Sequence, residues 1–137
     1  MITTLPNDLI TGHLEIDEQH LRFLNYIEEL KDCCITGNKK KVKLIFVRLL
    51  EHVISHFAYE ELLMAKLKYP LNLFKEHRQE HIILQNYYIA KFRPILSDNF
   101  EIEEVFELFD VKFNEHLTGA DKLLSQFIQS QPLQIQP

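Results

Sequence analysis

Three short segments of this 137-residue chain carry histidines and carboxylates at one-turn spacings: HFAYEE (56–61), HRQEH (77–81) and HLTGAD (116–121). His56 and Glu60 are four residues apart, as are His77 and His81, so the members of each pair share one face of a helix. A buried polar group without a partner costs several kcal/mol. A group of such residues on apolar helix faces therefore favours metal ligands over ordinary core residues.

The elements that would position these residues are helices. Four segments repeat apolar residues at the three- and four-residue spacings of an amphipathic helix. They run from about Asp17 to Thr36, from Lys39 to Lys68, from Leu71 to Phe92, and from near Phe100 through Phe127. Gly37 and Asn38 have the residue types of a helix C-terminus and N-cap, Pro70 ends the second segment, and Pro94 is predicted to close the third. Because the connections are short, the sequence predicts an all-α fold, an antiparallel up-down-up-down four-helix bundle.

This topology brings the polar residues to one depth. They lie early in the first and third predicted helices and late in the second and fourth, and in an up-down-up-down bundle these positions meet at one end. The predicted cluster contains five histidines and two carboxylates: His20, His56, Glu60, His77, His81, His116 and Asp121.

The donor set restricts the metal. Imidazole suits iron, zinc, copper or nickel, and mixed imidazole and carboxylate donors suit iron well. Seven ligands are too many for one tetrahedral zinc ion. They suit two metal ions, with the carboxylates bridging, and bundle cores are known to build such sites.

The complete order H…HxxxE…HxxxH…HxxxxD, which spans about residues 9–125 and includes IDEQH (16–20), resembles the hemerythrins, specifically their bacterial single-domain members. The resemblance implies a non-heme centre of two iron ions in the core, with an oxo or hydroxo bridge and with Glu60 and Asp121 bridging both ions. It also implies one filled iron and one iron with an open position, held by His77, His81 and His116 and by His20 and His56, respectively.

The function that the resemblance implies is reversible oxygen binding, for storage, delivery or sensing, with no enzymatic activity. Dioxygen would be the partner, with azide or nitric oxide as possible small ligands. Two other classes stay open: a di-iron enzyme such as a peroxidase or oxidase, and a protein that handles or senses iron or nitric oxide. We expect a monomer or a small homo-oligomer.

Residues within one turn of the expected ligands are predicted to form the pocket or to support the ligands. Phe113 and Leu117 flank His116 and are expected to be apolar pocket walls. His52 lies one turn before His56 and is a core histidine bonded to a neighbour, a residue of the pocket or of the support behind a ligand, or a ligand itself. Glu61 is expected at the surface or behind a ligand, and His13 is expected to be solvated.

Composition limits the remaining classes. A net charge of −5 and a single basic run, KKKVK (39–43), exclude a broad nucleic-acid-binding face. No apolar run approaches the ~20 residues of a membrane span. The N-terminus lacks the pattern of a signal peptide, so a cytoplasmic location is expected. We expect one domain over residues 1–137, with an arm at about 1–15, the bundle at about 16–129 and a frayed tail at about 130–137.

Overall fold

The computed structural model describes residues 1–131, and these residues contain helices and no strand. The elements are a short 3-10 helix, η1 (Asn7–Leu9), and the α-helices α1 (Leu14–Thr36), α2 (Lys39–Lys66), α3 (Leu71–Ala90), α4 (Phe92–Leu96), α5 (Ile102–Thr118) and α6 (Ala120–Gln129). In this part of the chain, no helix has an apolar stretch of the length that crossing a bilayer requires.

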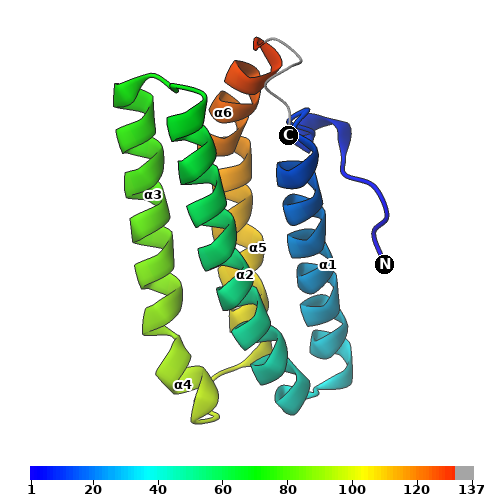
Figure 1. Ribbon diagram of the computed structural model, residues 1–137. Coiled ribbons are helices and arrows are strands. Elements are labelled where there is room, and N and C mark those ends of the chain that lie inside the picture. The colour runs from blue at the N-terminus through cyan, green and yellow to red at the C-terminus, as the bar shows by residue number, and fades with distance from the viewer. Residues whose placement is uncertain (132–137) are drawn as a thin grey trace.

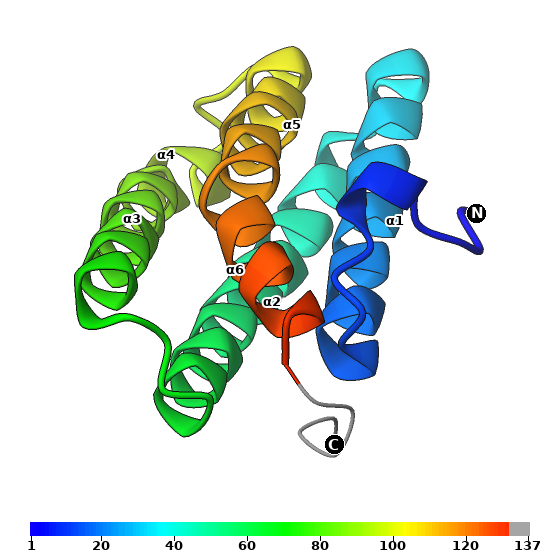
Figure 2. The ribbon, with the colours of Figure 1, turned by 90° about the horizontal axis from the view of Figure 1, so that it is seen from above.

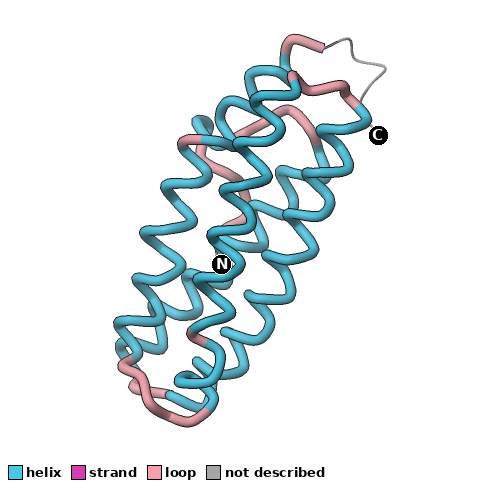
Figure 3. The backbone as a smooth tube through the Cα atoms, turned by 90° about the vertical axis from the view of Figure 1, so that its left-hand side faces the viewer, coloured by secondary structure: helices cyan, strands magenta, loops and turns pink. Residues whose placement is uncertain are grey.

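The long helices form four antiparallel columns, the fourth of which is α5 continued by α6 (Figure 1 and Figure 3). Seen from above in Figure 2, α1 packs against α2 and α5, and α3 packs against α2, α5 and α6. The predicted up-down-up-down four-helix bundle is confirmed.

The turn between α1 and α2 follows the sequence signals. Gly37 ends α1 in the left-handed conformation (φ 70°), and its N–H donates to the carbonyl of Cys33. Asn38 caps α2, because its Oδ1 accepts the N–H of Lys41 at 3.1 Å. Both caps fix the direction in which α2 returns along α1.

The start of α1 differs from the prediction. The helix begins at Leu14 rather than near Asp17, because the side chain of His13 caps it: Nδ1 accepts the N–H of Ile16 at 3.3 Å. His13 is 1% exposed, so the expectation that it is solvated was wrong. Asp17 holds the preceding arm in place, since its Oδ1 accepts from the N–H and the Oγ1 of Thr11 at 2.9 and 2.7 Å.

The later helices are more divided than predicted. The third helix ends at Ala90, and a separate short helix, α4, contains Pro94. Proline is tolerated there because N–H groups in the first turn have no partner within the helix. The predicted fourth helix is interrupted at Gly119 (φ −105°, ψ −94°), which separates α5 from α6.

The apolar core consists of two separate clusters. The larger one fills the length of the bundle toward α4 and includes Phe23, Leu49, Phe57 and Phe109. The smaller one lies at the other end and is built from Ile16, Leu63, Met64, Leu67, Tyr69, Leu124 and Ile128. The polar residues singled out above lie between the two clusters in every column.

The predicted frayed tail is only partly covered. Ser130 and Gln131 form a turn and a bend after α6, and residues 132–137 lie outside the described part of the chain.

Candidate metal centre

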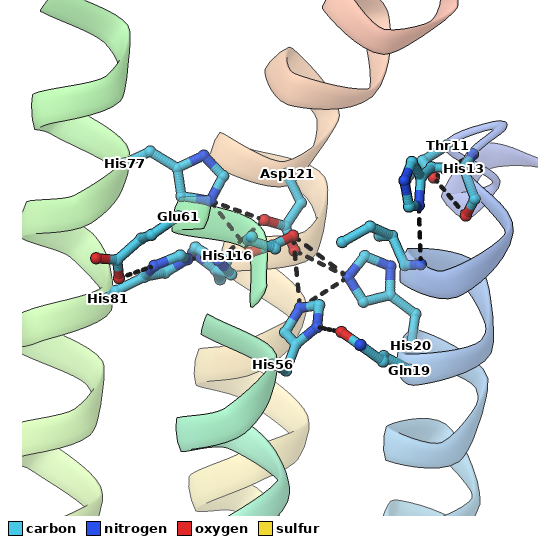
Figure 4. Close-up of polar contacts among 12 residues, drawn as sticks. Thr11, His13, Gln19, His20, His56, Glu61, His77, His81, His116 and Asp121 are labelled. Atoms are coloured by element: carbon cyan, nitrogen blue, oxygen red, sulfur yellow. Dashed lines mark hydrogen bonds and ion pairs between the residues drawn. The ribbon is translucent and has the colours of Figure 1, made fainter. Parts of the chain in front are cut away.

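All seven predicted ligands meet inside the bundle, and Figure 4 labels the five histidines and Asp121 among them. α1 contributes one, α2 and α3 contribute two each, and α5 and α6 contribute one each. None is more than 2% exposed: His20, His56, Glu60, His77, His81, His116 and Asp121. The helical spacing of four explains the pairs on α2 and α3, because both members of a pair face the same side.

The break at Gly119 explains how His116 and Asp121, which are five residues apart, can face the same point. At about 100° per residue, two side chains five positions apart on a continuous helix point about 140° apart. His116 and Asp121 nevertheless face one another, with Nε2 and Oδ1 3.0 Å apart. The backbone of Gly119 turns between them, and a Cβ at that position would lie 3.0 Å from the carbonyl oxygen of Glu115. A glycine is therefore suited to the turn that aims Asp121 inward.

The side chains form two overlapping groups with the geometry of metal donors. One group contains three histidines and both carboxylates: Glu60, His77, His81, His116 and Asp121. The other contains two histidines and the same carboxylates: His20, His56, Glu60 and Asp121. The ligand atoms within each group lie within 4.8 Å of one another. We call these groups the three-histidine position and the two-histidine position.

Glu60 divides its oxygens between the two positions. Oε1 lies 3.1 Å from Nε2 of His81 and 3.5 Å from Nε2 of His77. Oε2 lies 3.4 Å from Nε2 of His56 and 3.8 Å from Nε2 of His20. Each oxygen of this single carboxylate thus faces a different set of imidazoles.

Asp121 divides its oxygens in the same way. Oδ1 lies 3.0 Å from Nε2 of both His77 and His116, whereas Oδ2 lies 3.2 Å from Nε2 of His20. Although these separations are short, neither Asp121 oxygen has a partner with hydrogen-bond geometry in the described chain, and the same holds for Oε2 of Glu60. Donor atoms that converge without pairing are those of a site shaped for a cation.

The electrostatics agree with this description. Burial alone would raise the pKa of Glu60, but the surrounding imidazoles, His56 foremost, hold it well below its usual range. Burial and Glu60 would likewise raise the pKa of Asp121, which His116 and His20 keep well below its usual range. Burial opposes protonation of His77, yet the two carboxylates raise its pKa to about 9. The centre of the cluster therefore favours positive charge.

The outer nitrogens of three histidines are held by side chains of neighbouring helices. Nδ1 of His56 donates to Oε1 of Gln19 at 2.5 Å, and Nδ1 of His81 donates to Oε2 of Glu61 at 3.0 Å. Nδ1 of His116 donates to Oε1 of Glu80 at 2.6 Å. Such bonds fix the ring so that Nε2 faces the centre of the cluster.

Sequence reasoning left Glu61 open between a surface and a supporting role, and it missed Gln19 and Glu80. These two lie next to His20 and His81 in sequence, so their proximity to predicted ligands was visible in the sequence. Each serves a histidine on a different helix, however, and only the packing of the helices reveals that.

Phe113 and Leu117 lie against the cluster. The ring centroid of Phe113 is 6.3 Å from that of His56 and 5.9 Å from that of His116. Leu117 is 3% exposed and lines a narrow cavity of about 10 Å³ with His20 and Asp121. A further wall, Phe57, was not predicted, and its ring stacks on that of His81 at 3.9 Å.

His52 lies one step outside the cluster. Its Nε2 donates to the backbone carbonyl of Gln19 at 2.8 Å, and its ring lies 6.3 Å from that of His56. This bonding is that of a half-buried histidine tied to a neighbouring helix. Its ring lies beside that of His56, and its hydrogen bond holds the helix segment that carries Gln19.

Comparison with known proteins gives a consistent result in sequence and structure. No family model matches the chain. A bacteriohemerythrin of Pseudomonas aeruginosa (strain UCBPP-PA14) is 32% identical over 75 residues, which cover 55% of this chain and 48% of that protein. A bacteriohemerythrin of Methylococcus capsulatus (strain Bath) is 32% identical over 65 residues, 47% of this chain and 48% of that protein. The chain thus spans about half the length of the curated relatives it matches.

Two solved structures share the fold. A wild-type hemerythrin superposes with a TM-score of 0.81 at 22% identity, covering 95% of this chain and all of that one (100%). A leucine-to-phenylalanine mutant superposes equally well, with a TM-score of 0.81 at 23% identity and coverage of 95% and 98%. At these identities the likeness concerns the fold alone.

Proposed function

Because this chain belongs to the hemerythrin family, we propose that it binds dioxygen reversibly at a non-heme di-iron centre. The metal ligands are His20, His56, Glu60, His77, His81, His116 and Asp121. Storage, delivery and sensing all use this same binding reaction.

The observation that carries the proposal is the division of the carboxylate oxygens. Glu60 and Asp121 each turn one oxygen toward the three-histidine position and the other toward the two-histidine position. A carboxylate that serves a single metal has no reason to be shared in this way. Two such groups in one buried cluster support a pair of bridged metal ions.

The residues present fit iron. The cluster offers five imidazole nitrogens and two carboxylates, a mixture that suits iron, and too many donors for one tetrahedral zinc ion. Orphaned buried atoms, Oε2 of Glu60 and both oxygens of Asp121 among them, would be satisfied by a cation. His77, His81 and His116 would fill one position, and the two-histidine position has one imidazole fewer, so that an exchangeable ligand can occupy the remaining place.

When bound, the iron pair supplies the electrons that dioxygen accepts on binding and that return on its release. The side chains of this protein would hold the metal ions and shield the site from water. Phe57, Phe113 and Leu117 give the cluster an apolar boundary on the side of the larger core cluster. Such a wall excludes water, and exclusion of water protects a reactive ligand from side reactions. The outer acceptors keep the imidazoles neutral at Nε2 and oriented inward.

The test is reconstitution of the full chain with Fe(II) in the absence of oxygen. We expect about two irons per chain, and an absorption band that appears on admission of oxygen and disappears under vacuum. Binding of only one metal, or a band that evacuation does not remove, would overturn the proposal. Sustained turnover of hydrogen peroxide would favour a peroxidase instead, and a stable complex with nitric oxide but no reversible oxygen band would favour nitric-oxide handling.

A further inference from the structure

The three outer acceptors follow one rule around the bundle. Each is adjacent in sequence to a ligand of its own helix, and each receives a hydrogen bond from a ligand of the next helix. The pairs are Gln19 with His56, Glu61 with His81, and Glu80 with His116, and they connect α1 to α2, α2 to α3 and α3 to α5. The remaining two histidines lie outside the series, because Nδ1 of His20 on α1 and Nδ1 of His77 on α3 have no partner among residues 1–131.

The acceptors differ in charge between the two positions. The two-histidine position has one neutral acceptor, the amide oxygen of Gln19. Nε2 of Gln19 donates to Oε1 of Glu15 at 3.1 Å, so the amide oxygen is the atom that faces His56. Both acceptors of the three-histidine position are carboxylates, Glu61 and Glu80. The acceptors of the three-histidine position therefore carry two negative charges, whereas the acceptor of the two-histidine position carries none.

A carboxylate acceptor changes what an imidazole can do. When Nδ1–H donates to an anion, proton density moves away from the ring and Nε2 becomes a stronger electron-pair donor. Hydrogen bonds to a charged acceptor are also roughly twice as strong as those to a neutral one. An imidazole whose Nδ1–H donates to a neutral amide gains less electron-pair donor strength at Nε2. Two of the three histidines of the three-histidine position, His81 and His116, should thus be the better ligands, in addition to this position having one imidazole more.

We propose that Glu61 and Glu80 act as positioning residues that make the three-histidine position the first to load with a divalent metal, and that neutral Gln19 leaves the two-histidine position as the second. The inference rests on the two metal positions of the proposed function. Of the two carboxylates, Glu80 has the larger effect. The reason is that the other oxygen of Glu61 lies 3.5 Å from Nε of Arg78, which offsets part of its negative charge.

Order of loading can be read with Co(II) and azide. Metal-free full-length protein is titrated with Co(II) in two steps, and azide is added after each step while the visible spectrum is recorded. Azide reports the two-histidine position, because that position has the exchangeable place. In the wild type the first equivalent should give no azide response, and the second should give the full response.

The variants test the cause. Exchange of the anionic acceptors for amides in the double variant Glu61→Gln/Glu80→Gln should lower the preference for the three-histidine position by about 10–100-fold. The azide response then begins with the first equivalent. Gln19→Glu should shift the order in the same direction by strengthening the other position. Glu76→Gln is the matched control, since it removes one exposed carboxylate of α3 next to a ligand without touching an imidazole bond.

Each result decides. If the double variant still shows no azide response until the second equivalent of Co(II) is added, the inference is overturned. The same holds if the wild type responds to azide after the first equivalent. If the Glu76→Gln control shifts the loading order as much as the double variant does, the effect comes from the net charge around the site rather than from the imidazole bonds, and the inference is overturned. Two Co(II) ions that load in the expected order, in a protein whose iron form does not bind oxygen reversibly, would leave this inference standing and remove the proposed function.

Discussion

Removal of the Glu60 carboxylate should affect both metal positions at once, which no histidine substitution can do. Each imidazole belongs to one position, whereas Glu60 presents Oε1 to His81 at 3.1 Å and Oε2 to His56 at 3.4 Å. Glu60→Ala deletes both donors. Glu60→Gln keeps the volume and one oxygen, but its NH₂ group cannot bind a metal, and the bridging charge is lost.

The expected magnitudes follow from this geometry. The wild type should hold about two irons per chain, Glu60→Gln about one, and Glu60→Ala less than one. Glu60 is 0% exposed and is surrounded by imidazoles, so its loss also leaves buried polar groups without a partner. Removal of one member of a buried ion pair costs about 3–5 kcal/mol, a large share of the roughly 5–15 kcal/mol that stabilises a domain. Glu60→Ala should therefore unfold at markedly lower urea concentration, and Glu60→Gln should be less affected.

The assay is iron per chain after anaerobic reconstitution and desalting, with circular dichroism to check folding. Glu51→Gln is the control, because it changes an exposed carboxylate on the same helix. Glu61 does not serve this purpose, since it accepts a hydrogen bond from His81. A folded Glu60→Gln protein with two irons and an unchanged spectrum would refute the bridging assignment.

Three further substitutions test the surroundings of the cluster. Leu117→Ala should widen the cavity beside His20, at a stability cost of about 2–5 kcal/mol. At unchanged iron content we expect faster autoxidation and faster azide binding, measured by stopped flow. Unchanged rates would place the pocket elsewhere. His52→Leu removes the bond to the Gln19 carbonyl and should lower the free energy of unfolding in urea by about 1 kcal/mol, while a faster autoxidation would instead give His52 a part in oxygen binding. His13→Asn tests the cap of α1: burial lowers the pKa of His13 from 6.5, so the capping contribution is complete above pH 6.5 and is lost as the pH falls through the lowered pKa. As the pH falls, the stability difference between the wild type and this variant should therefore shift in favour of the variant by up to about 1 kcal/mol, and a difference that does not change with pH would contradict it.

The fold and the membership of the cluster could be predicted because both depend on local periodicity. A spacing of four fixes His56 beside Glu60 and His77 beside His81 on any helix, and the antiparallel order of four helices then sets the common depth. Gly37 and Asn38 marked a turn by backbone chemistry that is equally local. Nothing in these arguments requires knowledge of distant contacts.

The parts that could not be predicted depend on packing between segments. Glu80 neighbours one ligand and serves another 36 residues away, and no periodicity signals such a contact. The burial of His13 follows from the path of the arm over α1, and the break at Gly119 follows from a backbone conformation rather than from a residue pattern. The uninterrupted fourth helix of the sequence analysis could not by itself explain why Asp121 faces His116.

The division of the apolar core has a consequence for how the bundle unfolds. Two clusters separated by a polar layer have few means of stabilising one another, so cooperativity between the two ends depends on what joins the layer. In the metal-free protein we expect the smaller cluster, around Ile16, Met64 and Leu124, to open as a local unit while the larger one stays folded. Iron bound to ligands from every column would couple the two units into a single transition, since metal binding free energy becomes folding free energy. Supply of the metal would then determine how often one end of the molecule is open to proteolysis.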